Sequence, residues 1–352
     1  MMAYEVKEAK ELVIKAGRKL LESGLIARTW GNISARISQE QFVITPSGRD
    51  YESLTPKDIV CVNIADASYE GKIKPSSEKG VHAEGYRLRP DVDFIVHTHQ
   101  RHASALSILG ETLTGWDRED PSDAGILGTK VPCAAYGLSA SEAITQNVSH
   151  AIASHPNSRA VLMKYHGALC LGRDFEDAFA IAHALENVAG RLYEKRVGEI
   201  IPKTDPILRY EIDLAALGLQ NFYSMKNSTD RAVCLFTDAP FIKKMSSYGL
   251  PMQPYLDDLA QIAGTCIGCV AQDATEKEIK DALSDASAVM IQNKGALCFG
   301  INSSEAEAVC MVLEKGAQAA YLAHVLGEIS PVDPVSAKMD RSVYVKSYVK
   351  LR

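Results

Sequence analysis

The chain has 352 residues, of which 46% are hydrophobic and 23% charged, a balance that excludes an intrinsically disordered chain and suits one large or two ordinary domains. A net charge of −6, with no run rich in lysine and arginine, argues against a nucleic-acid partner. The sequence has no apolar stretch of about 18 residues and no apolar signal core at its N-terminus, so we expect a cytoplasmic protein without a membrane partner.

Three loops of small residues lie beside strand-like runs in the first 80 positions. They read "TWGNISAR" (29–36), "ITPSG" (44–48) and "KPSSE" (74–78). Backbone N–H groups and hydroxyls at Gly31, Gly48 and the Ser76–Ser77 pair could converge on an anion, although each loop alone is only a turn. Together they suggest a phosphate site.

Three histidines are crowded into "IVHTHQRHASALS", which begins at Ile95. The preceding apolar run predicts a buried strand, on which His97 and His99 point to the same face and can chelate one ion. His102 follows His99 by three residues, at a predicted helix start, and is a weaker candidate. A catalytic zinc site takes three protein ligands, and His166, after the apolar run "AVLMKYH", could complete the set. On the H-x-H pattern alone, ordinary core histidines are an equally weighted alternative.

The chain also repeats itself. Aligned at a constant offset of 128 residues, positions 160–197 are identical to 288–325 at about 14 of 38 places, including "GALC" in both. This period is too long for a solenoid and predicts a duplicated domain. His166 becomes Lys294 in the second copy, so any metal of the first copy would be absent there.

The two predicted copies are unequal, because the second lacks the counterpart of roughly the first 90 residues. We predict a first domain, a linker, a truncated second domain and a C-terminal tail. These are residues 1–206, 207–228, 229–335 and 336–352.

The first copy resembles the class II aldolase/adducin family, closest in motif to fuculose-phosphate aldolases. The resemblance rests on "GNIS", "TPSG", "PSSE", the 19-residue spacing from Glu78 to "HTH", "VPCAAY" and "HGALCLG". It implies an α/β fold, an α/β/α layered domain with a mostly antiparallel central sheet.

The resemblance also implies roles for individual residues. His97, His99 and His166 would bind Zn²⁺, or another divalent ion such as Mn²⁺ or Co²⁺, and Glu78 would be the acid/base. The substrate phosphate would be held by Gly31, Asn32, Ser47, Gly48, Ser76 and Ser77. The expected reaction is reversible cleavage of a small phosphorylated sugar, a ketose 1-phosphate, to dihydroxyacetone phosphate and an aldehyde.

Family aldolases also take a tyrosine from the neighbouring subunit of a fourfold ring. The corresponding region of the first copy, "TLTGWDREDPSDAG", has none and carries Asp117, Arg118 and Asp120 instead, whereas the second copy has Tyr255. We therefore predict a homo-oligomer, either a dimer arranged as a pseudo-fourfold ring or a higher assembly, with Tyr255 as a catalytic residue. A packing role for Tyr255 is the alternative.

Two further interpretations stay open. The same site could epimerise or decarboxylate a sugar (acid) phosphate, and "HTHQRHA" also resembles the ribulose-phosphate 4-epimerase branch, but that branch carries an aspartate where this chain has Glu78. An adducin-like interaction module without catalysis would lack the metal, and the three histidines argue against it.

Overall fold

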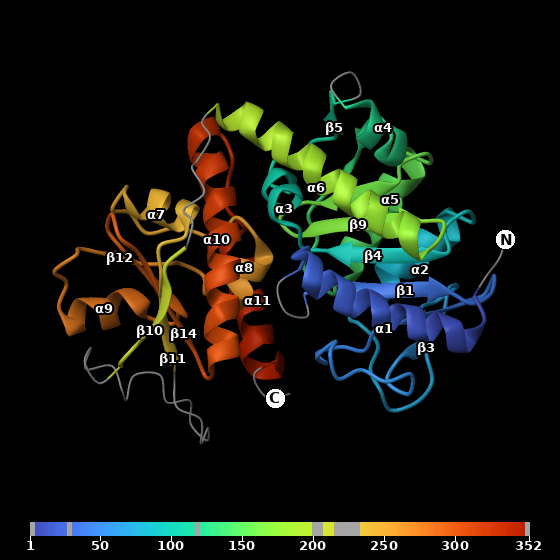
Figure 1. The fold of residues 1–352 in the computed structure, drawn as a ribbon, viewed down its shortest axis with the longest axis horizontal. Helices are drawn as coiled ribbons and strands as arrows, with labels where there is room; N and C mark the ends of the chain where they lie inside the picture. The colour runs from blue at the N-terminus through green and yellow to red at the C-terminus, as the bar shows by residue number, and fades with distance from the viewer. Residues whose placement is uncertain (1–3, 27–29, 117–119, 199–206, 215–232, 349–352) are drawn as a thin grey trace. The chain divides into compact units, whose positions relative to one another are not determined.

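The structure, a computed structural model, divides the chain into two compact units, Met1–Tyr193 and Glu194–Arg352 (Figure 1). Helix α6 (Phe175–Val197) crosses this boundary, which lies ahead of the predicted domain boundary at residue 206. Most of the predicted linker 207–228 lies outside the described residues. The structure describes residues 4–26, 30–116, 120–198, 207–214 and 233–348.

The first unit is built on a seven-stranded sheet of order β3-β2-β1-β4-β9-β8-β7. Only the β7–β8 pair is parallel, so the prediction of a mostly antiparallel central sheet is confirmed. Its strands are β1 (Asn32–Arg36), β2 (Gln41–Ile44), β3 (Val60–Asn63), β4 (Phe94–Thr98), β7 (Cys133–Ala134), β8 (Ala160–Met163) and β9 (Gly167–Gly172). A separate two-stranded ribbon pairs β5 (Leu113–Thr114) with β6 (Lys130–Val131).

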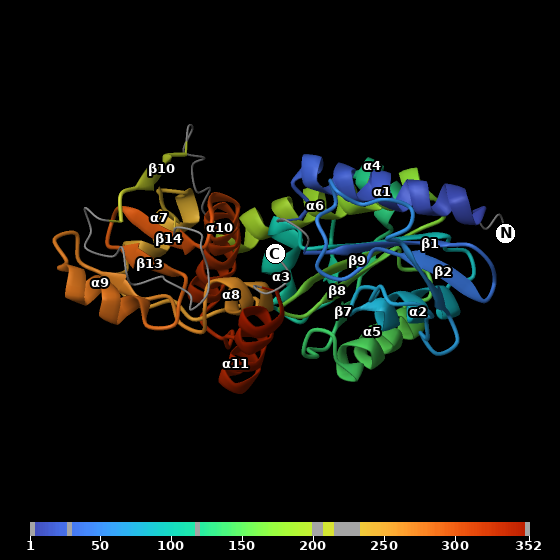
Figure 2. The ribbon, with the colours of Figure 1, turned by 90° about the horizontal axis from the view of Figure 1, so that it is seen from below.

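Helices cover both faces of this sheet. Figure 2 shows α1 and α6 over one face and α2 and α5 over the other, which gives the expected α/β/α layers. On the α2–α5 side, Ile95 and Leu169 from the sheet pack with Val81 and Val148 from the helices, so the central strands are buried on both faces. The remaining helix bounds are α1 (Val6–Ser23), α2 (Lys79–Leu88), α3 (Arg101–Ser107), α4 (Pro121–Leu127) and α5 (Glu142–Ser154).

The second unit has a smaller sheet of order β10-β11-β14-β13-β12, with α9 on one face and α10 on the other (Figure 1). Its strands are β10 (Arg209–Ile212), β11 (Val233–Thr237), β12 (Cys269–Val270), β13 (Ala288–Ile291) and β14 (Gly295–Gly300). Its helices are α7 (Pro240–Ser246), α8 (Asp257–Ile262), α9 (Glu276–Leu283), α10 (Ser303–Leu326), α11 (Pro334–Val343) and the π-helix η1 (Tyr344–Tyr348).

Four strands have the same arrangement in both units. The run β4-β9-β8-β7 and the run β11-β14-β13-β12 each contain two antiparallel pairs followed by one parallel pair. The register also agrees, because Thr98 faces Ala168 in one unit and Thr237 faces Ala296 in the other, a shift of 128 along the second strand.

The two units also share a helix-capping contact. The Glu186 carboxylate accepts hydrogen bonds from the backbone N–H groups of His102 and Ala103, at 2.8 and 3.1 Å, at the start of α3. Glu314, 128 positions later, accepts from Phe241 and Ile242 at the start of α7, at 3.2 and 3.0 Å. A carboxylate at a helix N-terminus satisfies donors that the helix leaves unpaired.

Within the part of the chain that the structure describes, no helix combines the length and apolar character that crossing a membrane requires.

Candidate metal and sugar-phosphate site

His97 and His99 lie together at the C-terminal end of strand β4. His97 and His99 alternate with Thr98, so both rings project from the same face, and their Nε2 atoms lie 2.9 Å apart. Both side chains are buried, His97 at 1% and His99 at 5% exposure. The predicted meeting of the two rings is therefore observed, with His97 in β4 and His99 one residue beyond the end of the strand.

His166 joins the pair from the tight turn between β8 and β9. Tyr165 in this turn has a φ of 64°, which a bulky residue rarely adopts. Gly167 follows, and a Cβ there would lie 2.2 Å from the backbone oxygen of Thr98, so only glycine permits this approach of the turn to β4. The His166 Nε2 consequently lies 3.1 Å from that of His97.

The three imidazoles fit a divalent metal ion. His97 Nδ1 donates a hydrogen bond to the Ala168 carbonyl at 3.0 Å, which leaves its Nε2 lone pair directed at the other two rings. Bonds of about 2.0–2.1 Å to a tetrahedral ion place two nitrogen ligands about 3.3 Å apart, close to the observed separations. Among the described residues, this is the one group of three or more candidate ligands whose atoms lie within 4.8 Å of one another.

Glu78 lies against the same nitrogens from the start of α2. Its Oε1 is 2.8 Å from His166 Nε2, and its Oε2 is 3.3 Å from His97 Nε2. Burial acts to raise the pKa of Glu78, but the neighbouring histidines, His97 first, outweigh it and hold the pKa well below its ordinary range. The carboxylate can therefore serve as a base or as a further ligand.

Two of the predicted phosphate loops lie side by side. Pro46 and Pro75 form an antiparallel bridge, Ser47 N–H donates to Lys74 O at 3.0 Å and Ser76 N–H donates to Thr45 O at 2.9 Å. Gly48 has a φ of 67° and so makes a turn that favours glycine. Ser76 is buried, whereas Ser77 is exposed and Ser47 and Gly48 are half-buried.

The first loop is held to β4 by close backbone packing. A Cβ on Gly31, whose φ is 121°, would lie 2.6 Å from the His97 backbone oxygen. The Gly31 carbonyl accepts a hydrogen bond of 2.6 Å from Tyr51 Oη. Gly31 therefore has a structural reason to be glycine that does not depend on any bound anion.

Sequence reasoning missed a buried group behind Glu78. Asn32, in β1, directs its side chain to Glu78 and also contacts His82, a fully buried histidine on α2. The sequence does place His82 near Glu78, because His82 follows Glu78 by four residues and such spacing puts two side chains on one face of a helix. The pairing of Asn32 with these residues depends on the sheet and was not visible.

The other candidates lie elsewhere. His102 Nδ1 lies 2.8 Å from Glu186 Oε1, so its ring takes part in the α3 cap contact. Tyr255 is half-buried, two residues before α8, in the second unit, whereas all the other predicted site residues are in the first. Asp117 and Arg118 lie outside the described residues, and Asp120 caps α4 through the Asp123 N–H.

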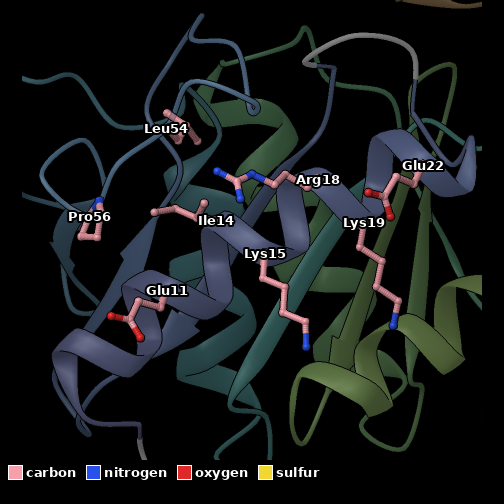
Figure 3. A pocket seen from close by; sticks show the side chains of 8 residues that line it. All are labelled: Glu11, Ile14, Lys15, Arg18, Lys19, Glu22, Leu54 and Pro56. Carbon is pink, nitrogen blue, oxygen red and sulfur yellow. The ribbon is translucent and has the colours of Figure 1, made fainter.

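A separate pocket lies along the exposed side of α1 (Figure 3). Ile14 and Arg18 point from the helix toward Leu54. Lys19 pairs with Glu176 at 3.2 Å, and its ammonium lies 4.5 Å from the centre of the Phe179 ring. The lining mixes both signs of charge and contains none of the candidate site residues. It consists of Glu11, Ile14, Lys15, Arg18, Lys19, Glu22, Leu54 and Pro56.

Comparison with known proteins agrees with this geometry. Residues 11–193 match the family described as class II aldolase and adducin N-terminal domain. A 5-deoxy-D-ribulose 1-phosphate aldolase of Bacillus thuringiensis serovar kurstaki is 33% identical over 204 residues, which cover 57% of this chain and 91% of that protein. An L-fuculose phosphate aldolase of Escherichia coli K12 is 31% identical over 210 residues, 60% of this chain and 92% of that protein.

Among solved structures, a Klebsiella pneumoniae protein described as an aldolase, epimerase or decarboxylase aligns with a TM-score of 0.50 at 24% identity. The alignment covers 57% of this chain and 96% of that one, and it shows a shared fold.

Proposed function

This chain belongs to the family of class II aldolase and adducin N-terminal domains, and on that premise we propose that its first unit is a metal-dependent sugar-phosphate aldolase. The reaction is reversible cleavage of a ketose 1-phosphate to dihydroxyacetone phosphate and an aldehyde. One observation carries the proposal: three buried imidazole Nε2 atoms and the Glu78 carboxylate meet at one point.

Each protein group has a chemical task in this proposal. His97, His99 and His166 hold a divalent ion, which as a Lewis acid polarises the substrate carbonyl when bound, and zinc suits the three nitrogen ligands. Glu78, next to the same nitrogens, transfers the proton at the carbon beside that carbonyl. Because the imidazoles are neutral ligands, they leave the charge of the ion available to the substrate.

The three small-residue loops fix the far end of the substrate. Gly48 and Ser77 are partly or fully exposed and carry donors that can reach an anion, which supports a phosphate site there. Anchoring the phosphate would orient the reacting carbon toward Glu78. The proposed set is Gly31, Asn32, Ser47, Gly48, Ser76 and Ser77.

We further propose that the second unit is a degenerate copy of the first. The shared strand order, the register and the Glu186 and Glu314 contacts support a duplication. By this register, Phe236 stands where His97 stands in the first unit. Asp238 and Lys294 occupy the positions of His99 and His166, so the second unit lacks the three-histidine set.

A screen of ketose 1-phosphates with metal-replete protein, using coupled detection of dihydroxyacetone phosphate, tests the proposal. Metal-dependent release of this product from at least one substrate is expected. Epimerised or decarboxylated products without dihydroxyacetone phosphate would replace the aldolase assignment by one of those reactions. Purified protein without stoichiometric metal, and without turnover after metal is added, would contradict an enzymatic role.

A further inference from the structure

A buried chain of hydrogen bonds runs from Glu78 to the far side of α2. Asn32 Nδ2 lies 2.8 Å from Glu78 Oε2, and Asn32 Oδ1 contacts His82 Nε2. His82 Nδ1 lies 2.6 Å from Ser34 Oγ, which lies 2.8 Å from Tyr86 Oη. All five side chains are buried.

With Glu78 ionised and His82 neutral, the chemistry of these groups fixes the direction of every hydrogen bond. An ionised Glu78 only accepts, so the amide of Asn32 must present its NH₂ to the carboxylate and its oxygen to His82. His82 Nε2–H then donates to that oxygen, and the unprotonated Nδ1 accepts from the Ser34 hydroxyl. Ser34 in turn accepts from the Tyr86 hydroxyl, so all groups are satisfied with His82 neutral.

From this geometry we propose that His82 and Asn32 are positioning residues for Glu78, the proposed proton-transfer group. Because His82 occupies the Asn32 oxygen, the amide cannot rotate by 180° without placing its NH₂ against an N–H and its oxygen against a carboxylate. The amide therefore holds Glu78 Oε2 in one place beside His97. The catalytic consequence of this inference rests on the proposed aldolase function, whereas the positioning of Glu78 by Asn32 and His82 does not depend on it.

The assignment is compatible with a phosphate role for Asn32. One hydrogen of its NH₂ points to Glu78, and the second stays available to an anion. The neutral state of the imidazole agrees with its surroundings, since burial lowers the pKa of His82 to about 3. A neutral His82 also adds no second cation beside the proposed metal.

Three variants separate positioning from general packing. His82→Leu removes the donor to Asn32, Asn32→Asp keeps the acceptor for His82 but loses the donor to Glu78, and His82→Gln restores an N–H at the position of Nε2. Tyr86→Phe is the matched control, because it removes one hydroxyl from the same buried network while leaving the contacts among Asn32, His82 and Glu78 intact.

The first readout is exchange of the proton beside the carbonyl of dihydroxyacetone phosphate with deuterated water, measured in metal-replete protein alongside kcat, KM and metal content. We expect His82→Leu to lower exchange and kcat by about 10- to 100-fold, with normal metal content and little change in KM. Asn32→Asp should lower exchange and kcat to a similar extent and should also raise KM, because its carboxylate lies in the proposed phosphate site. His82→Gln should recover much of this loss, and Tyr86→Phe should stay near wild type.

The second readout is the crystal structure of each metal-free variant, in which His82→Leu should lengthen the contact from Asn32 Nδ2 to Glu78 Oε2. An unchanged contact, exchange near wild type in His82→Leu, or an equal loss in Tyr86→Phe would overturn the proposal. Wild-type protein without exchange or cleavage on any substrate would instead overturn the proposed function, and the crystal structures would still decide whether His82 and Asn32 position Glu78.

Discussion

Each of the three histidines of the proposed metal site owes its orientation to a different local cause. His97 is fixed by its hydrogen bond to Ala168 O, His99 by strand alternation and His166 by the turn at Tyr165 and Gly167. Because the positions are set by backbone structure, replacing one ring should remove a ligand without moving the other two.

We therefore expect about one divalent ion per chain and a large loss of metal affinity in His97→Ala. Elemental analysis after dialysis measures both. His183→Ala, which changes an exposed histidine on α6, is the control and should retain its ion. Two ions per chain, or tight metal binding by His97→Ala, would refute the three-histidine site.

Glu78 gives a second prediction at the level of one residue. Glu78→Gln keeps the size and the hydrogen-bonding reach of the side chain but cannot accept the substrate proton, so turnover should fall by roughly 10²- to 10⁴-fold. Metal content is measured on the same sample. Near-normal turnover with metal bound would remove Glu78 from the mechanism, and a loss that follows metal content would make it a ligand only.

At the level of elements, the sequence predicted what local periodicity determines. Alternation on β4 placed His97 and His99 together, and the apolar runs predicted the central strands. The contact of Asn32 with Glu78 depends on β1 lying next to β4, where Asn32 faces His97. Such pairing of distant strands has no local signature, so the support behind Glu78 could not be predicted in the same way.

Helix α2 should make stability depend on pH through His82. The pKa of His82 is about 3 when folded, against about 6.5 when unfolded. Between these values the unfolded chain binds a proton that the folded chain does not. The stabilisation from a neutral His82 is therefore complete above pH 6.5. Below that pH the free energy of unfolding falls, and this group accounts for up to about 1.4 kcal/mol of the fall per pH unit.

Urea unfolding of metal-free protein at several pH values checks this dependence. Burial is the main cause of the low pKa of His82, with His97 lowering it further and Glu78 raising it. The stability advantage of wild type over His82→Gln should shrink as the pH falls from 6.5 to 4, because only the wild type loses the stabilisation that comes from a neutral buried imidazole. A difference that stays constant across that range would contradict the assignment of a neutral buried imidazole.

The loops at 45–48 and 74–77 predict a preference for phosphorylated substrates. Phosphoglycolate should inhibit competitively, and Ser77→Asp should raise KM more than Ser77→Ala does, since an added carboxylate repels the phosphate. Steady-state kinetics on both variants provide the measurement. If the wild type processes unphosphorylated sugars equally well, these loops are structural turns and do not bind phosphate.

At the level of the whole molecule, the proposed duplication pairs positions whose residues differ in a complementary way. The first holds the three histidines, while the aligned positions of the second carry Phe236, Asp238 and Lys294. Conversely, the second unit carries Tyr255 just ahead of α8. In the first unit, the described residues just ahead of α4, such as Trp116 and Asp120, include no tyrosine. Such differences are expected if one catalytic site is divided between two copies of the domain.

We therefore predict a homodimer in which catalytic and degenerate units alternate around a pseudo-fourfold ring, with Tyr255 of a second unit serving each metal site. Tyr255→Phe removes only the hydroxyl that would take the proton from the substrate hydroxyl as it becomes the aldehyde carbonyl, and return it in the reverse reaction, so kcat should fall while metal content and melting temperature stay at wild-type values. Tyr248→Phe, a matched change in the same unit, should leave kcat unaltered. Light scattering should give the mass of two chains. A crystal structure of the assembly with the Tyr255 hydroxyl remote from every three-histidine site would rule out the shared site, as would Tyr255→Phe protein with wild-type turnover.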